Sequence, residues 1–150
     1  MNYTYDQRGL LETLSNSEVT YNFSYNQFGN IADVTIGESL TAVQYEYNSY
    51  NGKLNKIVYE NGYAERYVYD HLDNISEIWY TVDGVETKAY EYAYTQKGQL
   101  YSITNCSTGV ITVYRYDQIG RLVGSGEYSS EDNRNDYTTK ISYDEHSRLY

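Results

Sequence analysis

Residues able to carry out acid–base or nucleophilic catalysis are few and scattered along this sequence of 150 residues. The single cysteine, Cys106, has no histidine near it in the sequence, whereas a nucleophilic thiolate needs an activating base. The two histidines, His71 and His146, lie in short polar stretches that are typical of turns. We therefore predict no catalytic residue, with the cysteine at a loop or strand end and both histidines in exposed turns.

Three alternating positions near the end of the sequence, Asp132, Arg134 and Asp136, have the spacing of a calcium-binding loop. Arg134, however, occupies a position that needs an oxygen ligand, and no glycine or distal glutamate follows at the required spacing. This segment therefore indicates a solvated hairpin tip. We expect neither a metal site nor a cofactor in this protein.

Aspartates could serve as general acids or bases, but several of them recur at one position of a repeated Tyr–Asx motif. A tyrosine anchor returns at intervals between 20 residues, from Tyr5 to Tyr25, and 27 residues, from Tyr116 to Tyr143. Asp, Asn or Thr follows each anchor, and a glycine or its substitute comes shortly afterwards. The seven anchors are Tyr5, Tyr25, Tyr47, Tyr69, Tyr94, Tyr116 and Tyr143.

Turn geometry explains the Asx and glycine positions, because a type I turn favours Asp or Asn at its first position and Gly at its fourth. A glycine there often adopts a positive φ and closes a hairpin with a bulge. Ser147 holds this position in the last repeat, where we expect a distorted turn. The predicted structural turn residues are Asp6, Gly9, Asn26, Gly29, Asn48, Gly52, Asp70, Asp73, Gly98, Asp117, Gly120 and Asp144.

The residues on either side of each turn are hydrophobic and predict strands. The residue two positions before the anchor is aromatic in every repeat but the last, which places two rings on one face of a strand. After the turn, hydrophobic residues stand three apart, as at Leu11 and Leu14. That spacing does not suit a regular strand, so we predict a β-bulge or a late strand start between the two positions.

A second set of turns separates the Tyr–Asx hairpins from one another. Asn61-Gly62 and Asp83-Gly84 are both typical of two-residue hairpin loops. We therefore predict an all-β fold: an antiparallel meander of tandem hairpins, with roughly 14 short strands, that forms a twisted and partly curled sheet. Residues 1–150 would be a single array of about seven repeats without capping units.

Composition excludes several classes of partner. The net charge is −10 and the 11 basic residues are scattered, which disfavours both nucleic acid and anionic membrane surfaces. No stretch approaches the roughly 20 apolar residues of a membrane span, and the N-terminus lacks the features of a signal peptide. We predict neither nucleic-acid binding nor membrane insertion.

Tyrosine is the one abundant residue type with binding chemistry, since the chain has 22 tyrosines. Rows of tyrosines on a sheet face could stack on sugar rings and offer hydroxyl groups for hydrogen bonds. The other interpretation is that the rows are packing between neighbouring strands. Solvent exposure of the row would distinguish them. The candidate ligand-binding residues are Tyr45, Tyr67, Tyr92 and Tyr114.

The segment Tyr114–Leu122, with the sequence YRYDQIGRL, closely resembles the YD repeat of the Rhs family. Thr4–Leu11, Arg66–Ile75 and Ser142–Leu149 are similar but looser. The resemblance implies a β-sheet shell that encloses a toxic C-terminal segment, and related teneurins use such a shell in adhesion. It also implies a secreted or cell-surface protein whose partner is the remainder of the array or the toxin segment.

Some features of that family are missing from this sequence. The Rhs core after the repeats contains proline, and this chain has none. We therefore expect a fragment, or a short product that pairs with another chain, with open edges capable of edge-to-edge self-association. A structural wall segment is the first hypothesis for its function. A surface carbohydrate-binding or adhesion module, with cell-surface glycans as partners, is the alternative.

Overall fold

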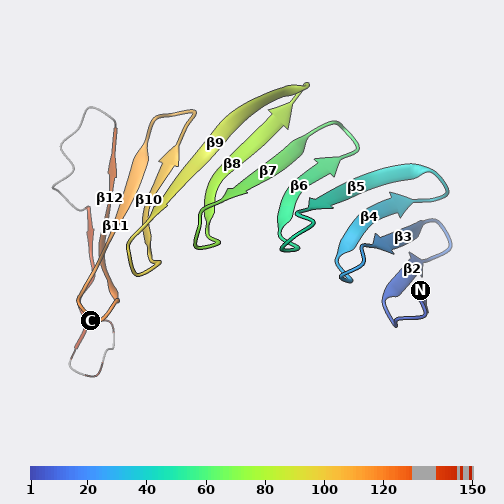
Figure 1. The fold of residues 1–150 in the computed structure, drawn as a ribbon, viewed down its shortest axis with the longest axis horizontal. Coiled ribbons are helices and arrows are strands. Elements are labelled where there is room, and N and C mark those ends of the chain that lie inside the picture. The colour runs from blue at the N-terminus through green and yellow to red at the C-terminus, as the bar shows by residue number, and fades with distance from the viewer. Residues whose placement is uncertain (130–137, 145, 147–148, 150) are drawn as a thin grey trace. The chain divides into compact units, whose positions relative to one another are not determined.

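The computed structural model describes residues 1–129, 138–144, 146 and 149. In this part of the chain, 13 strands form one antiparallel sheet in which each strand follows its neighbour in sequence (Figure 1). The predicted all-β meander is confirmed. The strands are β1 (Asn2–Tyr5), β2 (Leu11–Ser15), β3 (Thr20–Tyr25), β4 (Ile31–Ile36), β5 (Leu40–Tyr47), β6 (Leu54–Tyr59), β7 (Ala64–Tyr69), β8 (Ile75–Val82), β9 (Val85–Tyr94), β10 (Leu100–Asn105), β11 (Ile111–Tyr116), β12 (Leu122–Tyr128) and β13 (Thr139–Lys140).

The strands belong to two compact units. The first contains Met1–Tyr67 and Tyr80–Thr87, and the second contains Val68–Trp79 and Lys88–Tyr150. In the second unit an isolated antiparallel bridge joins Tyr143 to Leu149, where the last Tyr–Asx hairpin is expected.

A β-bulge follows the Tyr–Asx turn in hairpins of both units. In β1–β2, Tyr5 pairs with Leu11 whereas Thr4 pairs with Thr13, so Glu12 is the extra residue. The same shift of register occurs in β3–β4, β5–β6, β9–β10 and β11–β12. The predicted bulge is therefore confirmed in these five hairpins.

The bulge accounts for the irregular hydrophobic spacing after each turn. Without it, residues three apart would point to opposite faces of the sheet. With it, Leu11 lies opposite Tyr5 and Leu14 lies opposite Tyr3, and both tyrosines project from the same face of β1. One face of the hairpin therefore collects the aromatic pair and both leucines.

The two short turns predicted in the second set differ from each other. Asp83 and Gly84 form the expected two-residue loop between β8 and β9, with φ values of 51° and 77°. Positive φ at both residues is the signature of a type I′ turn, whose twist matches that of the strands. This prediction is confirmed.

The prediction of a two-residue loop at Asn61-Gly62 is wrong. The Tyr59 N–H donates to the Tyr63 carbonyl (2.9 Å), and the Gly62 N–H donates to the Tyr59 carbonyl (2.9 Å). Only Gly62 adopts a positive φ, of 80°. Because Asn61 does not share that conformation, the loop is longer and has the same hydrogen-bond pattern as the Tyr–Asx turns.

The sheet has very little fully buried hydrophobic surface. Within the described residues the buried hydrophobic side chains are Ala64, Val113 and Tyr128. Most other strand residues are half-buried, as expected of a single layer with solvent on both faces. Contacts between neighbouring hairpins must therefore supply much of the stability.

Candidate functional site

The Tyr–Asx turns are the most regular feature of the structure, and the sixth turn shows the arrangement that most of them share. The Asp117 N–H donates to the Arg121 carbonyl (2.9 Å), and the Gly120 N–H donates to the Asp117 carbonyl (3.1 Å). The Asp117 carboxylate accepts the N–H groups of Ile119 (3.1 Å) and Arg121 (2.8 Å) through Oδ1. Gly120 has a φ of 91°, a conformation that glycine adopts without steric cost.

The same hydrogen bonds recur in other turns, because Asp, Asn and Thr all provide a side-chain oxygen that can accept them. The first, second and fourth turns use Asp6, Asn26 and Asp70. The fifth uses the Thr95 hydroxyl, with longer bonds of 3.2 and 3.3 Å. Positive φ is found at Gly9, Gly29, Gly52, Asp73, Gly98 and Gly120.

The third and seventh turns depart from this pattern. The third has one more residue, so that the Gly52 N–H reaches the Asn48 carbonyl (2.9 Å). In the seventh, the Asp144 carboxylate accepts the His146 N–H (2.9 Å). Ser147, expected to distort this turn, lies outside the described residues.

The turn hydrogen bonds stabilise the ionised form of the aspartates. The N–H of Leu10 lowers the pKa of Asp6, and the N–H of Arg121 lowers that of Asp117. Partial burial opposes this effect at Asp70, yet the Asn74 backbone and side chain still hold its pKa below the usual value. The negative charge of these carboxylates therefore strengthens the hydrogen bonds within their turns.

This arrangement predicts a loss of stability in acid. A carboxyl whose pKa is lower in the folded state stabilises the fold above its unfolded pKa of about 3.9, and that stabilisation is lost as pH falls through the folded value. We expect Asp117→Asn to make unfolding by urea less sensitive to pH between about 5 and 2. Equal acid sensitivity in the variant and the parent protein would contradict the assignment.

The anchor tyrosines connect successive hairpins. The hydroxyl of each of five anchors donates to the backbone carbonyl of the Leu or Ile that begins the second strand of the preceding Tyr–Asx hairpin. The five pairs are Tyr25–Leu11 (2.7 Å), Tyr47–Ile31 (2.8 Å), Tyr94–Ile75 (2.8 Å), Tyr116–Leu100 (2.8 Å) and Tyr143–Leu122 (2.9 Å). We call these contacts the tyrosine cross-links.

Sequence reasoning missed the cross-links, although a signal for them was present. The anchor is tyrosine in all seven repeats, whereas the aromatic position two residues earlier also accepts Phe23. A position that needs only a packed aromatic ring accepts either Phe or Tyr. A position that is always Tyr indicates that the hydroxyl group itself forms a contact. The bulge gives a reason for the choice of acceptor, because the strand ladder is interrupted there.

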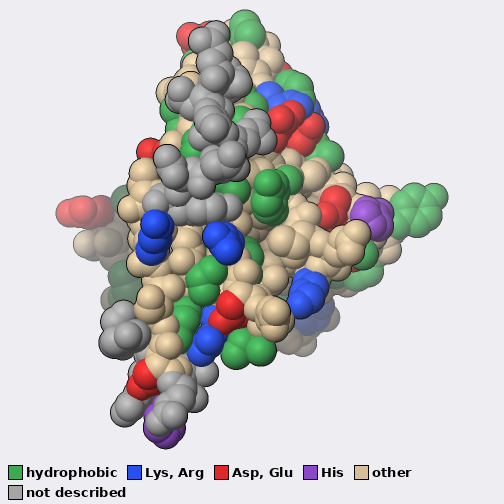
Figure 2. Space-filling view, turned by 90° about the vertical axis from the view of Figure 1, so that its left-hand side faces the viewer, with side chains coloured by type: hydrophobic (Ala, Val, Ile, Leu, Met, Phe, Trp, Pro, Cys, Tyr) green, Lys and Arg blue, Asp and Glu red, His purple; other side chains and the backbone are tan. Residues whose placement is uncertain are grey.

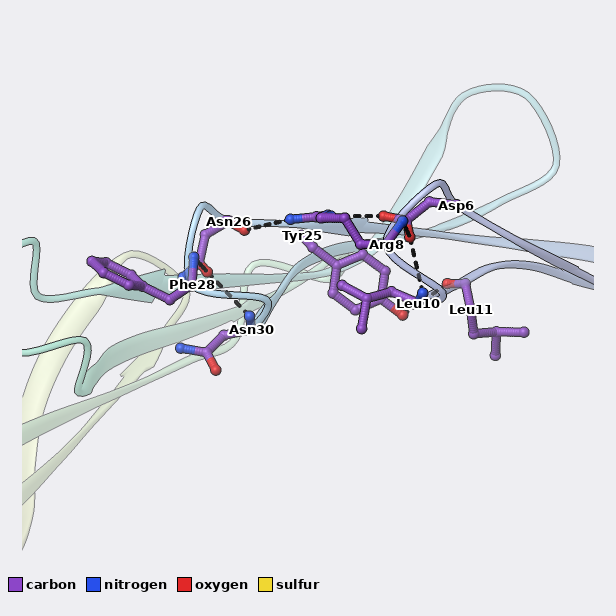
Figure 3. Close-up of polar contacts among 8 residues, drawn as sticks. All are labelled: Asp6, Arg8, Leu10, Leu11, Tyr25, Asn26, Phe28 and Asn30. Atoms are coloured by element: carbon purple, nitrogen blue, oxygen red, sulfur yellow. Dashed lines mark hydrogen bonds and ion pairs between the residues drawn. The ribbon is translucent and has the colours of Figure 1, made fainter.

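Side chains from the turns form further contacts with the next turn. Arg8 binds Asp6 (2.9 Å), donates to the Asn26 carbonyl (3.3 Å) and lies over the ring of Tyr25 (Figure 3). Farther along the chain, Lys97 donates to the Gln118 carbonyl (3.3 Å). These bridges reinforce the contact between one hairpin and the next.

The four tyrosines proposed as ligand-binding residues are all half-buried, so their exposure does not separate packing from binding. The Tyr67 hydroxyl donates to the Glu65 carboxylate (2.6 Å), and burial together with Glu65 raises the pKa of Tyr67. The same two causes raise the pKa of Tyr63 to about 12. Tyr45 and Tyr114 line shallow grooves between turns, and Tyr92 lines a third groove.

The other residues considered for chemistry are not gathered into a site. Cys106 is exposed, and its pKa is raised by partial burial and by Glu91, which disfavours the thiolate. His71 and His146 are exposed in turns. Among the described residues no group of His, Cys, Asp and Glu could hold a metal ion. Asp132, Arg134 and Asp136 lie outside the described residues.

Charged side chains are dispersed as the composition predicts. On the face drawn in Figure 2, Lys and Arg side chains lie apart from one another, among acidic and hydrophobic ones. Within the residues that the structure describes, no helix is long and apolar enough to cross a membrane.

Comparison with known families agrees with the repeat and its geometry. The family model described as the teneurin YD-shell matches residues 1–80, more than half of the chain. The chain belongs to the teneurin YD-shell family, and it is a structural repeat segment of such a shell. A search of curated protein sequences finds no match.

Solved structures share the fold at low sequence identity. The TcdB2–TccC3–Cdc42 structure matches with a TM-score of 0.78 and 16% identity over 99% of this chain. The Tc holotoxin pore of Photorhabdus luminescens matches with a TM-score of 0.76 and 17% identity over 94%. The structure of TcdB2–TccC3 without its hypervariable C-terminal region matches with a TM-score of 0.73 and 17% identity over 94% of this chain. The match covers only 9%, 8% and 8% of those chains, respectively.

Proposed function

We propose that this chain is one stretch of the wall of a larger YD-repeat shell, and that the shell encloses a toxic C-terminal segment. The tyrosine cross-links carry this proposal, because each one joins a hairpin to the preceding hairpin. The anchor tyrosine of each repeat thus contacts the neighbouring repeat, which is the arrangement expected in a tandem array. The wall role is passive, so we infer that the segment is not an enzyme.

Tyr5 provides a hydroxyl group through which a further repeat could pack on strand β1. Tyr5, the anchor of edge strand β1, is 61% exposed, and its hydroxyl contacts no hydrogen-bonding partner among the described residues. The other described anchors with a cross-link are half-buried. Tyr5 therefore offers a donor to the bulge carbonyl of another repeat, which would come from the remainder of the array or, at high concentration, from a second copy.

The wall role can be tested with two copies of the chain joined in tandem. In a repeat array, stability is the sum of the repeat terms and the interfaces between neighbours, so a new interface raises the stability of the whole. We expect the tandem chain to unfold at a higher urea concentration than the single chain. Two copies that unfold independently, with an unchanged midpoint, would overturn the proposal.

We propose that the natural protein carrying this segment is secreted or displayed at the cell surface, as the family resemblance implies.

A test of whether the shell encloses a toxic segment requires that full-length protein. A C-terminal segment inside the shell should resist protease until the wall is weakened, for example by combining Tyr47→Ala with Tyr116→Ala. Equal protease sensitivity with an intact and a weakened wall would reject enclosure. Tyr45→Phe and Tyr114→Phe, which leave the cross-links intact, are the matched controls.

A further inference from the structure

Four tyrosines in or next to the neighbouring strands β6, β7 and β8 gather around one carboxylate of the first compact unit (Figure 1). The ring centroids of Tyr59 and Tyr63 are 5.5 Å apart, and those of Tyr63 and Tyr80 are 5.7 Å apart, as in packed aromatic pairs. The Glu65 carboxylate accepts the hydroxyl groups of Tyr67 (2.6 Å) and Tyr63 (3.3 Å). We call these five residues the tyrosine cluster.

The geometry of the sheet sets this arrangement. The Tyr59 N–H donates to the Tyr63 carbonyl (2.9 Å) where β6 ends and β7 begins, so the two residues face each other across the hairpin. Residues two apart on a strand share a face, which places Tyr63, Glu65 and Tyr67 in one row. Tyr63 is the central member, because its ring packs against two other rings and its hydroxyl reaches the carboxylate.

The hydrogen bonds to Glu65 matter for the oxidation of these phenols. A phenol that loses one electron becomes a strong acid, so its hydroxyl proton must pass to an acceptor within hydrogen-bond reach. Glu65 is such an acceptor for Tyr63 and Tyr67. Burial and the charge of Glu65 raise the pKa of Tyr63 to about 12. Its phenol therefore stays protonated in neutral solution and must lose the electron and the proton together.

We propose that Tyr63 is a site of oxidative coupling, where a peroxidase and hydrogen peroxide join its ring to that of Tyr59 or Tyr80. Each of the two rings loses one electron and its hydroxyl proton, and the two phenoxyl radicals form a carbon–carbon bond ortho to their oxygens. Each ortho hydrogen then leaves its carbon as a proton while a proton returns to the oxygen. The two electrons and two protons released overall reduce one hydrogen peroxide to two water molecules, and the product is a dityrosine.

Proximity favours this reaction within one chain. Radicals on separate molecules must meet by diffusion, whereas the rings of the tyrosine cluster are already in contact and react at a high effective concentration. All four tyrosines are half-buried, so the oxidant can reach the cluster while the rings keep their positions. Tyr90 and Tyr92 of the second unit are also neighbours, but their centroids are farther apart, at 6.3 Å.

A dityrosine bond should stabilise this part of the sheet. A bond from Tyr63 to Tyr80 closes a loop that contains the fourth Tyr–Asx turn, and a bond to Tyr59 closes the short loop at Asn61-Gly62. As with a disulfide, closing a loop removes conformations from the unfolded chain. We therefore expect the coupled monomer to unfold at a higher urea concentration. This inference does not rest on the wall role, and the tandem-copy experiment does not bear on it.

Treatment of the 150-residue chain with a haem peroxidase and hydrogen peroxide, at low protein concentration, tests the site. Dityrosine fluorescence and the loss of two hydrogen atoms from the mass of the monomer report the coupling. Trypsin cuts after Arg66 and a glutamyl protease cuts after Glu60, so mass spectrometry can distinguish the two partners of Tyr63. We expect the main intramolecular bond to join Tyr63 to Tyr59 or Tyr80. Bonds that lie only elsewhere or only between chains, or no dityrosine at all, would overturn the proposal.

Tyr63→Phe keeps the ring and removes the hydroxyl, so this variant should lose most of the intramolecular dityrosine. Tyr90→Phe is its matched control, because Tyr90 is also half-buried and its ring also lies beside that of another tyrosine. The control should give the same yield as the parent chain, and urea unfolding should confirm that both variants are folded. Equal losses in the two variants would refute the assignment of Tyr63.

Glu65→Gln keeps a hydrogen-bond acceptor but removes the group that takes the proton, so coupling should slow by about tenfold or more. Added acetate, a diffusible carboxylate, should restore the rate of this variant but not that of Tyr63→Phe. A merely structural role of Glu65 would not respond to acetate. An unchanged rate in folded Glu65→Gln would contradict the role of Glu65 as the proton acceptor.

Discussion

Replacing Tyr116 with alanine should lower the free energy of unfolding by about 3 kcal/mol, since it removes a half-buried ring and its cross-link. Tyr116→Phe keeps the ring and should cost about 1 kcal/mol, the usual net value of a hydrogen bond. The bond in question joins the Tyr116 hydroxyl to the Leu100 carbonyl (2.8 Å). Urea unfolding of the two variants measures both effects.

Tyr114 provides the matched control for this experiment. It lies on the same strand, two residues before Tyr116, and is also half-buried, but its hydroxyl has no hydrogen-bond partner among the described residues. Tyr114→Phe should therefore change stability by less than about 0.5 kcal/mol. If Tyr114→Phe and Tyr116→Phe were equally stable, the cross-link would contribute nothing and the wall proposal would lose its main support.

Replacing Gly120 with alanine should cost about 2 kcal/mol, for two physical reasons. Its φ of 91° lies in the region that residues with a Cβ rarely adopt. A Cβ at this position would also approach the Gln99 Nε2 to 3.1 Å, and that amide donates to the Gly120 carbonyl (2.8 Å). The substitution thus strains the sixth turn and disturbs its bridge to the fifth. Urea unfolding again provides the measurement.

Asp73 allows the reverse substitution, from a residue with a Cβ to glycine at a position with positive φ. It holds the glycine position of the fourth turn with a φ of 70°. Asp73→Gly removes that strain but gives the unfolded chain more freedom, so we expect a change of less than about 1 kcal/mol in either direction. A loss at Asp73→Gly as large as that at Gly120→Ala would show that φ does not govern these positions.

The fold could be predicted from the sequence because its determinants are local. Strands, turns and the bulge after Leu11 all depend on residues within a few positions of one another, and the spacing of Leu11 and Leu14 shows the bulge directly. The error at Asn61-Gly62 has a local cause too. The dipeptide is compatible with two turn types, and Asn61 adopts the one that needs a positive φ only at Gly62.

The site could not be predicted to the same degree because it depends on contacts between hairpins. The Tyr25 hydroxyl reaches a carbonyl that is 14 residues earlier in the chain, and no spacing rule within a strand reveals that partner. The bridge from the Arg8 guanidinium to the Asn26 carbonyl is another example, because it joins residues that are 18 positions apart.

The tyrosine cross-links also give the array a polarity. Every described cross-link runs from a hydroxyl to a carbonyl earlier in the chain, so one edge of a hairpin donates and the other accepts. Two donating edges cannot satisfy each other, and a two-fold symmetric pairing of such edges would form no cross-link. Any association that uses them must therefore be head-to-tail, the arrangement that extends or closes a ring and does not stop at a dimer.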